Sequence, residues 1–169
     1  MLLRDIDFKK DYRTNENNLV KEFYLPALKV AKIYKRAVGF FSSTSLIQII
    51  DGIKFIIKNE GKIQLIVSPK LSDEDIEAIY NGYNSKEAII ESSILNSLEN
   101  LNSESDKKRL FVLSELIREG ILEIKVAFIS KEKKIGMYHE KIGVLVDENG
   151  DYLSFSGSMN ESVTAFSYN

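Results

Sequence analysis

One short segment holds the residues of this chain best suited to chemistry. His139 is the only histidine among 169 residues, and Lys141 stands two positions later in the apolar run YHEKIGVLV. Side chains two residues apart on a β-strand leave the same face, so this imidazole and ammonium would converge on one ligand. A neutral imidazole can attack phosphorus while a lysine neutralises the non-bridging oxygens. The pair therefore predicts phosphoryl-transfer chemistry.

A second polar segment follows after a turn. Gly157, Ser158 and Asn160 come directly after the strand pattern YLSFSG and before an expected helix start. Small residues and free backbone N–H groups at such a place suit an anion, and serine or asparagine side chains can hydrogen-bond its oxygens. We therefore expect a phosphate to lie between this segment and the histidine segment.

The composition excludes several other classes of site. The chain has no cysteine and one histidine, so disulfides, thiolate nucleophiles and a zinc centre with several histidines or cysteines are excluded, and we expect no metal and no cofactor. The net charge of −2 argues against broad nonspecific nucleic-acid binding, which would need a local basic patch here. The sequence shows neither a membrane-spanning apolar run nor a signal-peptide pattern, so we expect a cytoplasmic protein without a membrane partner.

Alternating strand and helix patterns are expected to position the two segments. A strand, a helix and a second strand in succession predict parallel pairing through a crossover. The whole chain, 1–169, is thus expected to form one α/β domain with a mixed, largely parallel β-sheet flanked by helices. The expected helices are a kinked helix or helix pair at 17–35, then 42–61, 72–80 and two more within 82–105 and 106–119. The expected strands are 36–41, 62–69, 121–129, 138–146 and 152–157, with a polar link at 131–137 and an Asn-Gly turn at 147–151.

These residues resemble the HKD signature of the phospholipase D superfamily. The resemblance rests on His139-x-Lys141, on Asp147 past the strand, and on Gly157-Ser158-x-Asn160. The superfamily includes lipases, metal-independent nucleases and DNA-end-processing phosphodiesterases. Over nearly the whole chain, the succession YKRAVGFFSSTSLIQIIDGI, GKIQLIVSPKLSDEDIEAI and YHEKIGVLVDENGDYLSFSGSMNES is similar to the phospholipase D-like domains at the N-terminus of helicase-like restriction and defence proteins.

The resemblance implies half of a phospholipase D-type site and therefore a partner. In the superfamily mechanism one histidine forms a phosphohistidine, and another, from a second motif, protonates the leaving oxygen. With a single histidine, the second must come from an identical subunit across a two-fold axis or from elsewhere in a longer protein. The resemblance thus implies a homodimer acting on nucleic acid, with DNA as the expected substrate, and an N-terminal fragment of a helicase-like polypeptide.

The acidic member of the signature has two candidates. The superfamily places four residues between the lysine and the aspartate, whereas five stand between Lys141 and Asp147. An extra residue on a strand reverses the side-chain direction unless a bulge absorbs it. Glu161, beside Asn160, is the other candidate. Each also has a simpler interpretation, Asp147 as part of the DENGD turn and Glu161 as a complement to a helix N-terminus.

Two functions of different class remain open. The first is a metal-independent phosphodiesterase, a nuclease of a restriction or repair helicase. The second is a catalytically weak DNA-binding or dimerisation module with the same fold. Lipid headgroup hydrolysis has little support because no amphipathic membrane-binding segment is evident. Four basic residues near one face of an expected helix could track a nucleic-acid backbone, although a solvated face is favoured: Lys29, Lys32, Lys35 and Arg36.

Overall fold

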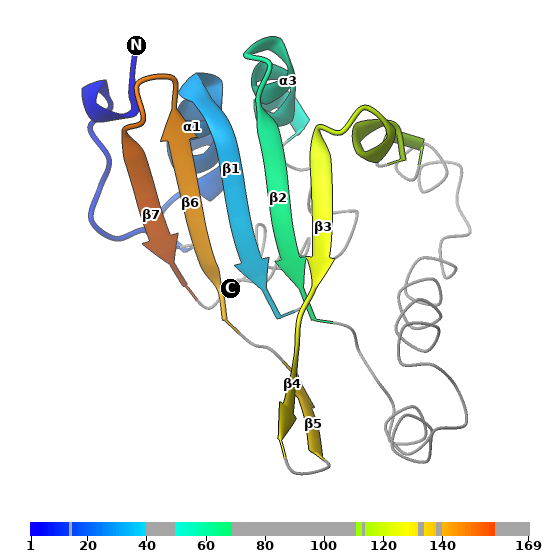
Figure 1. Ribbon diagram of the computed structural model, residues 1–169. Helices are drawn as coiled ribbons and strands as arrows, with labels where there is room; N and C mark the ends of the chain where they lie inside the picture. The colour runs from blue at the N-terminus through cyan, green and yellow to red at the C-terminus, as the bar shows by residue number, and fades with distance from the viewer. Residues whose placement is uncertain are drawn as a thin grey trace.

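A five-stranded mixed β-sheet forms the centre of the computed structural model (Figure 1), which describes residues 1–13, 15–39, 50–68, 111–112, 114–131, 134–137 and 140–157. The strand order is β3-β2-β1-β6-β7. β1 pairs with β2 and β2 with β3 in parallel, whereas β6 is antiparallel to both β1 and β7. The strands are β1 (Ala31–Val38), β2 (Lys62–Val67), β3 (Leu122–Val126), β6 (Ile142–Asp147) and β7 (Tyr152–Ser156). The expected α/β class with a mixed sheet is confirmed, although parallel pairing is limited to β1, β2 and β3.

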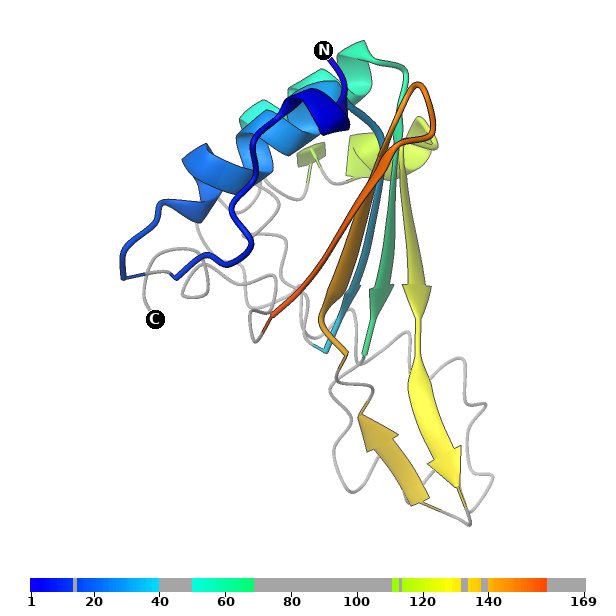
Figure 2. The same cartoon turned by 90° about the vertical axis from the view of Figure 1, so that its left-hand side faces the viewer.

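Helices cover one face of the sheet (Figure 2). A 3-10 helix, η1 (Leu3–Asp5), precedes a π-helix, η2 (Val20–Tyr24), which continues directly into α1 (Leu25–Val30). The crossover from β1 to β2 contains α3 (Ile50–Lys58), as the strand–helix–strand pattern predicted. A further helical stretch lies within 111–118, before β3. No helix among the described residues is long and apolar enough to cross a membrane.

The main core lies between these helices and the sheet. Tyr34 and Val38 of β1 and Ile63 and Leu65 of β2 point to the helical side and are fully or almost fully buried. Leu28 of α1 and several neighbours pack onto them. Burial of such apolar side chains contributes most of the favourable free energy of folding. The core therefore fixes which residues of each strand face the helices.

The crossover helix is capped at Glu60 and Gly61, and Gly61 is required there by close packing rather than by its backbone angles. The left-handed residue after α3 is Glu60, with φ 55°, and the Gly61 N–H donates to the Ile56 carbonyl at 2.8 Å. This bond, with that from Glu60 to Ile57, forms a Schellman motif. A Cβ at position 61 would lie 2.2 Å from the Lys32 carbonyl oxygen. The predicted helix stop at Gly61 is thus confirmed, and the chain there passes against β1.

The first strand begins earlier than the sequence pattern indicated. The helical segment ends at Val30, and residues 31–35 belong to β1 rather than to a helix. Consecutive strand residues point to opposite faces, so Lys35 is exposed and Arg36 is buried. The expectation that four basic residues share one helix face was therefore wrong.

The expected polar link at 131–137 was also wrong, because it contributes to a second sheet. β4 (Phe128–Lys131) and β5 (Lys134–Met137) form an antiparallel pair outside the five-stranded sheet. Figure 1 shows this hairpin extending beyond the carboxyl end of β3. The hairpin therefore stands beside the edge of the sheet where the candidate site lies.

Candidate functional site

The candidate site lies at the carboxyl edge of the parallel strands. β1, β2 and β3 end at this edge, the lower one in Figure 1, and β6 begins there, with Ile142 opposite Ala37. In open α/β sheets, ligands commonly bind outside the carboxyl ends of the strands. The residues just before β6 and just after β7 therefore lie at this same edge of the sheet.

Lys141 and Gly157 meet directly at this edge. The Gly157 N–H donates a hydrogen bond to the Lys141 carbonyl oxygen at 3.2 Å, which extends the pairing of β6 and β7 by one step. Lys141 comes immediately before the first residue of β6, and its side chain is buried, with 9% exposed. The ends of the two predicted polar segments therefore lie side by side. The tight Asn-Gly connection that brings them together is present, with Gly150 at φ 82°.

Arg36 is a second buried cation that sequence analysis placed on a solvated face. Its side chain is 3% exposed and points to the helical face of the sheet. Arg36 stands opposite Gly143 on β6, and Lys141 is two residues before Gly143. Such diagonal neighbours lie roughly 7–8 Å apart. Both residues belong to the buried face, so two basic side chains lie near this edge of the sheet.

Phe155 links Arg36 to the β6–β7 hairpin. Phe155 is paired with Gly143 across the two strands, and the Arg36 guanidinium lies 5.0 Å from the centroid of its ring. This geometry is a cation–π contact, which attracts the guanidinium to the ring face. A Cβ on residue 143 would lie 2.1 Å from the ring. Gly143 is therefore the residue that lets the ring reach across to Arg36.

Substitution of Gly143 by alanine is expected to displace the Phe155 ring and to disturb the position of Arg36. Overpacking of this kind costs roughly 1–3 kcal/mol of unfolding free energy. Urea unfolding followed by circular dichroism would measure the loss. Ser154→Ala, an exposed change on β7, is the matched control and should stay within roughly 0.5 kcal/mol of the parent. Equal stability of Gly143→Ala and the parent would contradict the packing of Phe155 on residue 143.

Asp147 lies at the opposite end of β6 from Lys141. Its carboxylate accepts hydrogen bonds from the backbone N–H groups of Leu3 at 2.8 Å and of Asn149 and Asp151, both at 3.0 Å. Burial acts to raise the pKa of Asp147, but these donors and the charge of Arg4 outweigh it and lower the pKa below its ordinary value of 3.8. Asp147 therefore shapes the turn, as its simpler interpretation held, and the structure does not bring it together with Lys141.

The other predicted site residues lie outside the described part of the chain: His139, Ser158, Asn160 and Glu161. Their described neighbours, Glu140, Lys141 and Gly157, fix where each segment leaves the sheet. The burial of Arg36 could have been predicted from the alternation of side-chain directions along AKIYKRAV, where Tyr34, Arg36 and Val38 share one face.

Comparison of the chain with protein-family models, with curated proteins and with solved structures finds no match.

Proposed function

We propose that this chain is a metal-independent phosphodiesterase, a nuclease domain of a helicase-like polypeptide, that acts through a phosphohistidine. The observation that carries the proposal is the meeting of Lys141 with Gly157 at the carboxyl edge, beside Arg36 as a second buried cation. Fixed positive charges and N–H donors stabilise the charge that develops on phosphorus oxygens. Lys141 and Gly157, the described residues of the two HKD-like segments, lie at this edge.

The reaction follows from the roles of these residues. A neutral ring nitrogen of His139 attacks phosphorus and forms a P–N bond, while the P–O bond to the leaving group breaks. His139 of a second copy gives the leaving oxygen its proton, and the same imidazole then accepts a proton from the water that cleaves the P–N bond. Lys141, Ser158 and Asn160 bind the non-bridging oxygens.

The acidic role in this proposal belongs to Glu161. An acidic group bonded to the imidazole would hold the tautomer whose other nitrogen attacks phosphorus. Asp147 is separated from Lys141 by five residues of an extended strand, which places it roughly 20 Å away. Its carboxylate also already accepts three backbone N–H groups. Glu161 follows Gly157 by four residues in the sequence, and Gly157 lies at the same edge as Lys141.

A DNA-binding or dimerisation module without turnover is the second candidate. The observation that favours it is the position of Asp147, because the residue that matches the acid of the signature serves the turn instead. The two candidates differ in whether a phosphodiester is cleaved at all.

Cleavage is expected to survive removal of divalent metals. The proposed site supplies its positive charge through Lys141 and Arg36 and its nucleophile through His139, so no step requires a metal. Hydrolysis of bis(4-nitrophenyl) phosphate, followed by absorbance, should proceed at the same rate with excess EDTA. Activity that disappears with EDTA and returns with magnesium would contradict the proposed mechanism, and absence of cleavage under all conditions would favour the binding module.

A further inference from the structure

A cleft beside the candidate site is bounded by the N-terminal segment 8–13. Its volume is about 770 Å³, and it lies between this segment, η2 and strand β7. The N-terminal segment runs alongside the sheet toward the carboxyl edge (Figure 2). Gly157 and Arg36, which belong to the candidate site, also line the cleft. The cleft is therefore continuous with the proposed site of phosphodiester cleavage.

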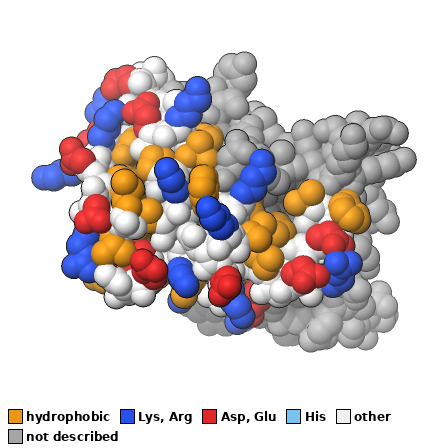
Figure 3. Space-filling view, turned by 90° about the horizontal axis from the view of Figure 1, so that it is seen from above, with side chains coloured by type: hydrophobic (Ala, Val, Ile, Leu, Met, Phe, Trp, Pro, Cys, Tyr) orange, Lys and Arg blue, Asp and Glu red, His pale blue; other side chains and the backbone are white. Residues whose placement is uncertain are grey.

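The described lining of this cleft is basic. It contains Lys9, Lys10, Arg13 and Arg36, and Asp11 is the only acidic residue in that described lining. The Arg13–Asp11 ion pair is long, at 3.9 Å, and both side chains are largely exposed, so it neutralises little charge. By contrast, Figure 3 shows acidic and basic side chains interspersed at the opposite end of the molecule. Basic residues thus outnumber acidic ones in the described lining, although the whole chain carries a net charge of −2.

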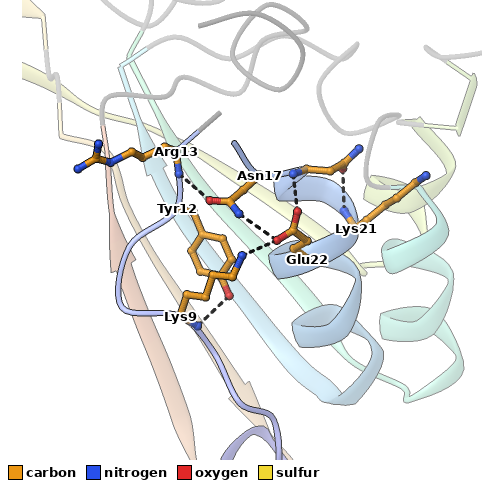
Figure 4. Close-up of polar contacts among 7 residues, drawn as sticks. Lys9, Tyr12, Arg13, Asn17, Lys21 and Glu22 are labelled. Carbon is orange, nitrogen blue, oxygen red and sulfur yellow. Dashed lines mark hydrogen bonds and ion pairs between the residues drawn. The ribbon is translucent and has the colours of Figure 1, made fainter. Parts of the chain in front are cut away.

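A hydrogen-bonded cluster holds the N-terminal segment in place (Figure 4). Lys9 donates to Glu22 at 2.8 Å, and Glu22 also accepts from the Asn17 side chain and from the Asn18 backbone. The hydrogen bond with Glu22 raises the pKa of Lys9. In Figure 4 the Arg13 guanidinium extends away from Glu22. Lys9 therefore anchors the segment, whereas Lys10 and Arg13 are the cations presented to a ligand.

Aromatic rings form the apolar part of the cleft. The half-buried rings of Phe8, Tyr12 and Phe155 each pack edge-to-face on Phe23, with centroids 5.7, 5.3 and 4.9 Å away. A groove that combines cations with aromatic side chains is the arrangement that binds single-stranded nucleic acid, because cations follow the backbone and rings receive bases. An apolar or neutral ligand would not account for the basic lining.

We infer that this cleft binds a single strand of nucleic acid and leads its backbone to the site beside Lys141. That the strand leads to Lys141 rests on the proposed function. Binding of the strand in the cleft does not, because binding and cleavage are measured separately. Lys10 and Arg13 contact backbone phosphates, and the rings around Phe23 contact bases. In a duplex the bases are paired and stacked on one another, so they would not be available to these rings.

The test compares the full chain with the double variant Lys10→Ala/Arg13→Ala. Affinity for a short fluorescein-labelled oligothymidylate, measured by anisotropy, should fall at least about tenfold. The slope of the logarithm of the binding constant against the logarithm of the salt concentration should become less negative by roughly 1.4. Lys58→Ala/Arg118→Ala removes the same charges from exposed positions outside the cleft and should bind like the parent. Unchanged affinity and slope in the cleft variant, or equal losses in both variants, would overturn the inference.

Two further measurements separate this inference from the proposed function. Hydrolysis of bis(4-nitrophenyl) phosphate, which is too small to need the cleft, should be the same in both double variants. If the parent binds the oligonucleotide through Lys10 and Arg13 but cleaves nothing, the inference holds and the proposed function fails. Tighter binding of a blunt duplex of the same length would overturn the assignment to single strands.

Discussion

Substitution of His139 by alanine is expected to lower the rate of phosphodiester cleavage at least about 10³-fold without unfolding the chain. The proposed mechanism needs this imidazole first as nucleophile and then, in a second copy, as acid and base, so one substitution removes every role. The described core is built from other residues, and the circular dichroism spectrum and urea midpoint should stay close to those of the parent. Oligonucleotide cleavage on gels and hydrolysis of bis(4-nitrophenyl) phosphate would measure the loss.

Mixing parent and His139→Ala chains tests whether two copies share the site. If each active unit needs one histidine from each of two chains, activity after subunit exchange should follow the square of the parent fraction. A linear dependence would show that each chain acts alone. Retained cleavage by His139→Ala would remove the imidazole from the mechanism, and an unfolded variant would make it structural.

Elements with a strong local pattern could be predicted from the sequence. β2 was expected at 62–69 and is Lys62–Val67, because KIQLIV alternates buried and less buried residues. α3 and the turn at Gly150 followed similarly from an apolar helical period and an Asn-Gly pair. In these segments the local preference and the tertiary contacts agree.

Elements whose shape depends on distant partners could not be predicted. AKIYKRAV carries four residues that are not typical strand formers, Lys32, Lys35, Arg36 and Ala31, yet it is the strand that pairs with both β2 and β6. The β4–β5 hairpin was missed because no Gly, Pro or Asn marks the turn between Lys131 and Lys134. Pairing partners, rather than local preference, decide both segments.

The candidate site also contains one feature that could be predicted from the sequence and others that could not. The approach of Lys141 to Gly157 follows from a tight hairpin and could be predicted from the sequence. The burial of Arg36 depends on Gly143 and Phe155, more than a hundred residues away along the chain, which admit its guanidinium to the helical face. The cleft likewise depends on contacts between the N-terminal segment and strands near the other end of the sequence. Such juxtapositions follow only from the sheet order.

Asp147→Asn is expected to lower the free energy of unfolding by roughly 1–3 kcal/mol, because a buried donor loses its acceptor. Asparagine can keep one oxygen for the local N–H groups of Asn149 and Asp151, but its NH₂ group then faces the Leu3 N–H. The Asp147 side chain is 4% exposed, so water cannot readily replace the lost bond. Urea unfolding at neutral pH would measure the difference. Asp151→Asn, which removes a partly exposed ion pair with Arg4, is the control and should cost at most about 1 kcal/mol.

The pH dependence of the stability difference tests whether the ionised carboxylate of Asp147 causes it. The pKa of Asp147 is lowered in the folded state, so its ionised form stabilises the fold fully above the ordinary pKa of 3.8. This contribution is lost as the pH falls from that value through the folded-state pKa, and the difference between the parent and Asp147→Asn should shrink over the same range. A difference that stays constant down to pH 3 would contradict the role of the charge. Because the bond to Leu3 holds the start of the N-terminal segment against the β6–β7 turn, Asp147→Asn should also weaken oligonucleotide binding at neutral pH.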